Sequence, residues 1–173
     1  MNMFGRLIRV LLTSWLRPRA GLLEETAIGF RVWLTDLDAL WHMNNGKYLT
    51  IMDLARVDMM IRTGLFRSIR RHGWYPVIAS ETIRFRKSLR PFQRFEIRTQ
   101  TLGWDERSFY LRQTFYSGGD TVAVAIVRAR FLAKGGGSVA AGELVETIAP
   151  GAVSPPLPTY IDDWQQAEGQ YAS

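Results

Sequence analysis

The feature that most constrains the fold is one long stretch with helical spacing, followed by four strand-like stretches. Between Lys47 and about Thr63 the apolar side chains recur every three or four residues, as on one face of a helix. Residues 27–35 alternate before it, and the strand-like stretches after it are residues 77–87, 93–102, 107–117 and 121–133. A sheet of about five or six strands has an apolar face to cover, and only the 47–63 helix is long enough to cover it. We therefore expect an α+β fold, with a curved antiparallel sheet wrapped around one long central helix.

Three regions are expected along the chain of 173 residues. Residues 1–20 form an N-terminal amphipathic helix, residues 21–150 form the main domain, and residues 151–173 form a proline-rich tail with a short helix at about 159–168. No repeat or linker divides the main domain, and the length suits one domain with a substantial core.

The composition excludes several kinds of chemistry. There is no cysteine, so disulfides, thiolate metal sites and cysteine nucleophiles are absent, and with only two histidines no metal site is expected. The formal charge is +6, and ten basic side chains lie between Arg62 and Arg98 against only Glu81 and Glu96. This balance fits either a solvated cationic surface or a basic mouth for a phosphorylated ligand such as coenzyme A. Nucleic acid is not expected as a partner, because no RNA-binding or recognition-helix pattern is present.

The first sixteen residues have an amphipathic pattern that admits two interpretations. Apolar side chains from Phe4 to Trp15 recur at helical spacing, and Arg6, Arg9 and Arg17 lie among them. Such a helix can dock on its own domain or on a second subunit. It can also lie in a membrane interface with its arginines toward anionic lipid. The cysteine-free composition fits a cytoplasmic location, and the second interpretation adds peripheral contact of residues 1–16 with the inner face of a membrane.

The polar residues with the clearest chemical potential lie between the first strand and the long helix. They occur in the run Asp36-Leu-Asp38-Ala-Leu-Trp41-His42-Met-Asn44-Asn45-Gly-Lys-Tyr48. A helix start presents free backbone N–H groups that can hold an anion or a developing oxyanion. A nearby carboxylate can act as a base or nucleophile. The alternative is purely structural, because aspartate and asparagine before a helix commonly serve as caps and turn formers.

This run, with its position directly before the long helix and with Ala55-Arg56 downstream, resembles the hotdog-fold thioesterases. Within them it is most similar to the 4-hydroxybenzoyl-CoA thioesterase type, including the THEM6-like proteins. The resemblance implies hydrolysis of acyl-CoA, or sometimes acyl-carrier-protein, thioesters. It also implies a homodimer or homotetramer with sites at the subunit interface, and no metal or bound cofactor.

The resemblance also implies roles for individual residues. Asp38 matches the nucleophile or general base, Asn45 lies near the group that binds the thioester oxygen, and His42 is a candidate for orienting Asp38 or the ligand. Gly46 would allow close backbone approach to the carbonyl. The further substrate-binding candidates are Tyr48, Arg84, Arg86 and Lys87.

Other acidic residues near the motif are expected to be structural. Asp36 is expected to shape the turn or pair with an arginine such as Arg31, and Asp53 is expected to pair with Arg56. An acyl pocket, or simply the core, would be lined by Met52, Met59, Met60 and Trp41. A function from another class also stays open, namely an acyl-binding or membrane-associated scaffold of the same fold that hydrolyses nothing.

Overall fold

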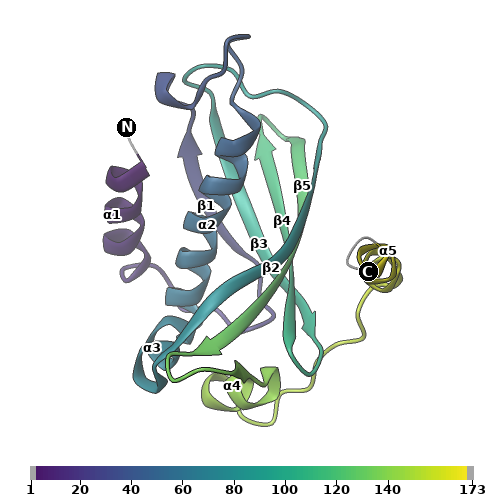
Figure 1. Ribbon diagram of the computed structural model, residues 1–173. Helices are drawn as coiled ribbons and strands as arrows, with labels where there is room; N and C mark the ends of the chain where they lie inside the picture. The colour runs from purple at the N-terminus through teal and green to yellow at the C-terminus, as the bar shows by residue number, and fades with distance from the viewer. Residues whose placement is uncertain (1–2, 171–173) are drawn as a thin grey trace.

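A curved antiparallel sheet holds one long helix in its concave face (Figure 1). The computed structural model describes residues 3–170, so the ends of the predicted N-terminal helix and of the tail lie outside the described residues. The elements in chain order are α1 (Met3–Ser14), β1 (Thr26–Arg31), the 3-10 helix η1 (Leu34–Asp36), α2 (Asn45–Arg62), α3 (Leu65–His72), β2 (Trp74–Phe85), β3 (Arg94–Trp104), β4 (Ser108–Ser117), β5 (Asp120–Ala133), β6 (Ser138–Val139), α4 (Ala141–Ile148) and α5 (Thr159–Gly169).

The sheet order is β1-β3-β4-β5-β2, with β6 also paired to β5. Neighbouring strands are all antiparallel, and one row of core side chains crosses the sheet through the pairs Ile28↔Ile97, Ile97↔Phe115 and Phe115↔Ala123. All four of these side chains are buried. The predicted fold class is therefore confirmed, and the apolar stretch 121–133 is an interior strand, as its composition indicated.

The apolar face of α2 fills the curve of the sheet. Its predicted stripe is buried throughout, from Tyr48 at 2% exposure to Met59 at 5%. The Tyr48 ring lies 5.0 Å from the rings of both Phe85 and Phe115, so it joins the helix to β2 and β4. Burial of each such side chain contributes about 1.5–3 kcal/mol. This packing fixes where the start of α2, and the motif before it, lies relative to the sheet.

The opposite face of the sheet is partly covered by α5 (Figure 1). Ile161 of this helix is fully buried, Glu168 pairs with Arg128 of β5 at 3.1 Å, and Gln165 donates to the Tyr110 hydroxyl on β4. This cover explains why most residues of β4 are buried on both sides of the strand.

Helix α1 closes the free edge of β1. The guanidinium groups of Arg6, Arg9 and Arg17 donate to the carbonyls of Arg31, Gly29 and Ala27 at 2.9, 2.7 and 2.8 Å. These carbonyls alternate along β1 and face away from β3, so the arginines occupy acceptors that an edge strand otherwise exposes. The helix therefore docks on its own chain, and the interpretation that turned its arginines toward lipid is wrong for Arg6, which is 1% exposed.

Several local predictions differ from the structure. The first strand ends at Arg31, and η1 occupies part of the stretch predicted to continue it. Helices α3 and α4 were not predicted, because each has only eight residues and little sequence over which a period can be read.

Candidate active site

The loop between β1 and α2 is fixed by a buried ion pair. The Asp36 carboxylate, 1% exposed, accepts from Arg6 Nη1 at 3.0 Å and from the Trp33 backbone N–H at 2.8 Å. Its own carbonyl accepts from the Asn44 N–H at 2.8 Å. Asp36 therefore shapes the turn and pairs with an arginine, as expected, but that arginine is Arg6 and not Arg31. The true partner comes from a helix thirty residues earlier, a distance over which sequence spacing carries no signal.

Asp38 lies in a tight turn that the Leu37–Met43 bridge closes. Its backbone N–H donates to the His42 carbonyl at 2.9 Å. Its carboxylate oxygen Oδ1 accepts from the N–H groups of Leu40 and His42 at 2.9 and 3.2 Å. The second oxygen, Oδ2, makes no hydrogen bond within residues 3–170. Asp38 thus acts as a turn former through one oxygen and keeps the other available.

The turn stores backbone strain. Trp41 has φ of 60°, in the left-handed region that bulky residues rarely occupy, and its side chain is 66% exposed. Leu40 beside it is 75% exposed. Strained residues of this kind cluster at functional loops, where the surroundings hold them in place.

The start of α2 presents an incompletely occupied set of amides. Asn44 is the N-cap, and its Oδ1 accepts from the Gly46 N–H at 2.9 Å. The Lys47 N–H donates to the Asn44 carbonyl at 2.9 Å. The Asn45 N–H makes no hydrogen bond to any described residue. Of the first two amides of α2, that of Gly46 already serves the cap, and that of Asn45 remains for an oxyanion.

The remaining predicted site residues lie in two places. Tyr48 is in the core, where burial raises the pKa of its hydroxyl and a backbone hydrogen bond from Leu89 opposes that shift. Arg84, Arg86 and Lys87 are exposed at the end of β2 and in the following loop, and Lys87 pairs with Asp120 at 2.6 Å. That loop adjoins the motif, because the Met43 N–H donates to the Leu89 carbonyl at 2.9 Å.

A second polar cluster lies deeper, where α2 faces the sheet. Arg56 donates to Gln113 at 2.6 Å, pairs with Asp53 as predicted, and lies 3.7 Å from Glu81 of β2. Burial raises the pKa of Glu81, Arg56 opposes this, and Asp53 adds to it. No sequence pattern indicated Gln113, which is fully buried and also donates to the Met52 carbonyl.

An apolar cavity of about 180 Å³ adjoins this cluster. Met59 and Met60 line it together with Phe109 and Phe131, and Arg56 forms part of its wall. Because a dry cavity of about 150 Å³ holds a benzene ring, this one accommodates a small apolar group. It partly supports the expectation that methionines of α2 line an acyl pocket. Trp41 does not border it.

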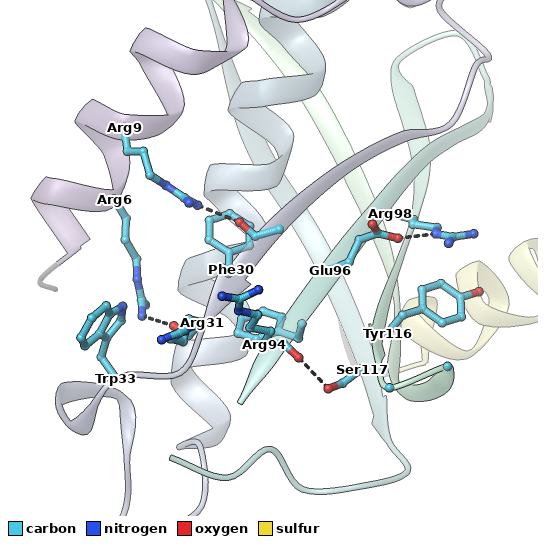
Figure 2. A pocket seen from close by; sticks show the side chains of 14 residues that line it. Arg6, Arg9, Phe30, Arg31, Trp33, Arg94, Glu96, Arg98, Tyr116 and Ser117 are labelled. Carbon is cyan, nitrogen blue, oxygen red and sulfur yellow. Dashed lines mark hydrogen bonds and ion pairs between the residues drawn. The ribbon is translucent and has the colours of Figure 1, made fainter. Parts of the chain in front are cut away.

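A basic hollow of about 800 Å³ opens over β1 and β3 on the side of the sheet away from α2 (Figure 2). Arg31 and Arg94 lie directly opposite each other on the two strands, and neither has an ion-pair partner within residues 3–170. The one carboxylate in the lining, Glu96, is bound to Arg98 at 2.7 Å. Like charges directly opposite each other destabilise a sheet, so an anion in this hollow would relieve the repulsion.

Comparison with known protein families shows the family of this chain. The model of the thioesterase-like superfamily matches residues 32–166, which include the loop and all of the sheet except β1. The chain belongs to this superfamily. The resemblance inferred from the motif is thereby confirmed.

Individual relatives agree with this assignment. The chain is 42% identical to protein THEM6 of Xenopus laevis over 109 residues, 63% of this chain and 53% of that protein. It spans about half the length of the curated relatives it matches. The YbaW probable thioesterase of Escherichia coli has a TM-score of 0.66 at 21% identity, over 72% of this chain and 96% of that one. A 1,4-dihydroxy-2-naphthoyl-CoA thioesterase from Synechocystis has a TM-score of 0.62 at 12% identity, over 72% and 94% of the two chains. The hotdog fold is therefore shared with solved thioesterases.

Proposed function

We propose that this superfamily member hydrolyses acyl-CoA thioesters, with Asp38 as nucleophile or general base. The observation that carries the proposal is the geometry of its carboxylate. Oδ1 is fixed by two backbone N–H groups, so the side chain is held in one orientation while Oδ2 stays available to attack a carbonyl or to take a proton from water. His42, whose carbonyl and N–H both bond to Asp38, supports that orientation through its backbone.

The thioester oxygen would bind at the first turn of α2. The Asn45 N–H makes no bond to described residues and lies at the positive end of a helix of 18 residues, where negative charge is stabilised. Gly46 leaves room for the substrate, and its own amide holds the Asn44 cap. Loss of one oxyanion donor slows acyl transfer by about 10²–10³.

Release of free thiol from a panel of short, long-chain and aromatic acyl-CoAs tests the proposal. Asp38→Asn keeps an oxygen for the Leu40 and His42 amides, so the fold is expected to persist while kcat falls by at least about 10². The matched control is Asp163→Asn, an exposed acid on α5, which should retain full activity. Equal inactivity of the wild type and Asp38→Asn across the panel would reject hydrolysis. If Asp38→Asn lowers the melting temperature as much as Asp38→Ala does, Asp38 would serve the turn alone.

We further infer a homodimer, or a homotetramer built from such dimers, that forms through the open edge of β2. This strand has 12 residues, pairs within residues 3–170 with β5 alone, and exposes Tyr75, Ile78 and Phe85 by 41, 38 and 40%. Long open edges attract a second strand, whereas α1 closes the edge at β1. Neither of the two cavities described above includes Asp38, which fits a crevice completed by a second subunit.

The phosphates of coenzyme A would bind Arg84, Arg86 and Lys87. The contact between Leu89 and Met43 places these side chains near the motif. The basic hollow at Arg94 is the competing place. Measurement of KM separates them: Arg86→Glu should raise KM for acyl-CoA about tenfold, and Arg94→Glu should leave it unchanged. The reverse result would move the phosphate site to the hollow.

A non-hydrolysing scaffold is the second candidate, because the Oδ1 contacts of Asp38 are also those of an ordinary turn former. In that case acyl-CoA would bind without release of thiol. The scaffold function would be favoured if the wild type binds a non-hydrolysable thioether analogue of acyl-CoA but cleaves no thioester in the panel. For either function we propose residues 21–150 as the acting domain, and the cytoplasm as its location.

A further inference from the structure

The outer face of α1 is strongly apolar although the helix is already docked. Its exposed side chains are among the largest apolar groups on the described surface: Phe4 at 69%, Ile8 at 45%, Leu12 at 67%, and just after the helix Trp15 at 52% and Leu16 at 88%. They follow one line along the helix, opposite the buried Arg6, Val10 and Ser14. Met3, Leu7 and Val10 pack inward against the core beside the buried Arg6 and Ser14, so α1 has apolar side chains on its inner face as well as on its outer face. Figure 1 shows α1 as the outermost element on that side.

Polar contacts on the inner side of α1 fix its orientation. Arg6 and Arg9 occupy carbonyls of β1, and the Ser14 hydroxyl donates to the buried Asp58 carboxylate at 2.6 Å. Arg17 also lies 3.3 Å from Asp58. These bonds hold the helix in one rotation, so the apolar line cannot turn inward. Contiguous exposed apolar patches of this kind mark interaction surfaces.

The charge around the apolar line indicates what covers it. One hollow adjoins Trp15 and the end of α1, and a second hollow shares Arg19 and Arg67 with it and also contains Arg71. Neither lining contains a carboxylate, and none of these three arginines has an ion-pair partner within residues 3–170. A second copy of the chain would bring the same arginines toward each other in a twofold interface. A surface with anionic groups outside and an apolar layer beneath them complements both the arginines and the apolar line.

We propose that this face, consisting of the outer line of α1 and the Arg19–Arg67–Arg71 cluster, docks on an anionic phospholipid bilayer. The apolar line inserts at the level between headgroups and acyl chains, where tryptophan is also favoured. The arginines bind lipid phosphates, and each adds to the affinity for an anionic surface. The helix stays folded against β1 while it binds. No helix within the described residues is long and apolar enough to cross a bilayer.

Co-sedimentation of the full chain with vesicles tests the proposal and does not depend on hydrolysis. The wild type should sediment with vesicles of phosphatidylcholine and phosphatidylglycerol, more weakly with phosphatidylcholine alone, and less at high salt. Leu12→Glu should reduce binding at least tenfold, and Phe4→Glu should repeat this at a second exposed position. Arg67→Glu/Arg71→Glu should remove the preference for anionic vesicles. The matched controls are Val153→Glu, an 83% exposed apolar residue elsewhere, and Arg107→Glu, an exposed arginine in the β3–β4 turn.

Three outcomes would overturn the proposal. The wild type could stay in the supernatant with anionic vesicles. Leu12→Glu could bind as strongly as Val153→Glu. The Leu12→Glu variant could have a smaller mass in solution than the wild type, which would assign the face to a second copy of the chain. Thiol release from a soluble acyl-CoA should be unchanged in Leu12→Glu, so a failure of this proposal is distinguishable from a failure of the proposed hydrolysis.

Discussion

Arg6 connects three parts of the molecule through one side chain. It lies on α1, pairs with Asp36 in the site loop, and donates to the Arg31 carbonyl at the edge of β1. Both charged groups are almost fully buried, with side-chain exposures of 1% and 2%. Buried ion pairs are costly to form, but removal of one partner leaves an uncompensated charge, which costs about 3–5 kcal/mol. The loop that holds Asp38 therefore depends on a residue of the N-terminal helix.

We predict that Arg6→Met lowers the free energy of unfolding by about 3–5 kcal/mol, because Asp36 is left buried without its cation. Urea denaturation measures this value. Arg107→Met, at an exposed position, is the control and should change stability by less than about 0.5 kcal/mol. A loss below about 1 kcal/mol in Arg6→Met would contradict the importance assigned to the pair.

Trp41 gives a prediction of the opposite sign. Its φ of 60° is strained for a side chain with a Cβ, and its 66% exposure means that little packing is lost on removal. Trp41→Gly should therefore raise the free energy of unfolding by about 1 kcal/mol, measured by thermal denaturation. Leu40→Gly is the matched neighbour, similarly exposed but not at positive φ, and it should lower stability. Destabilisation of equal size in both variants would show that Trp41 is not strained.

At the scale of elements, a hydrogen-bonded chain joins the β3–β4 turn to α5. Asp105 accepts from the Tyr110 hydroxyl at 2.7 Å, and Gln165 of α5 donates to that same hydroxyl. Burial, followed by the bond to Asp105, raises the pKa of Tyr110 to about 12 from 10.0. The folded protein thus retains a proton that the unfolded chain releases, which couples the docking of α5 to alkaline pH.

Stability should consequently fall as the pH rises from about 10 toward about 12. The contribution of Tyr110 is complete below the unfolded pKa and is lost through the folded pKa. In Tyr110→Phe this part of the decline should be absent. The free energies of unfolding of the wild type and of Tyr110→Phe should therefore differ more at neutral pH than at about pH 12. Denaturation at several alkaline pH values measures it, with Tyr160→Phe, an exposed tyrosine of α5, as the control. Parallel curves for wild type and Tyr110→Phe would contradict the coupling.

At the scale of the whole molecule, the two edges of the sheet differ. Arginines on α1 and just after it occupy the outward carbonyls of β1, whereas β2 has no neighbour beyond β5 within the described residues. This difference supports the proposed assembly through β2, which would leave the outer face of α1 available for the proposed bilayer contact.

We predict that Ile78→Lys, which adds a charge on the open strand, converts the assembly to monomers, as measured by analytical ultracentrifugation. Val153→Lys serves as the control and should not change the mass. If the proposed crevice forms between subunits, the same variant should also lose thioester hydrolysis. An unchanged mass in Ile78→Lys would rule out the β2 interface.

The fold was largely predictable because its signals are local. The buried stripe of α2 and the alternation of the long strands depend on residues two to four positions apart, and their order leaves few ways to cover one sheet face. The short helices α3 and α4 escaped prediction because eight residues carry too little periodicity. In the candidate site, the Asn44 cap and the Asp53–Arg56 pair were readable, since their partners are sequence neighbours.

The amino-acid sequence by itself determined the order of elements, the helix that fills the sheet, and the family to which the motif belongs. Only the tertiary structure decided that Arg6 neutralises Asp36, that Gln113 holds Arg56, and that α1 leaves a line of apolar side chains exposed on its outer face. The physical reason is that amphipathic spacing specifies a face but not its partner. The arginines of α1 gain more from the unpaired carbonyls of β1 and a buried carboxylate than from solvent, and those acceptors exist only once the sheet has formed.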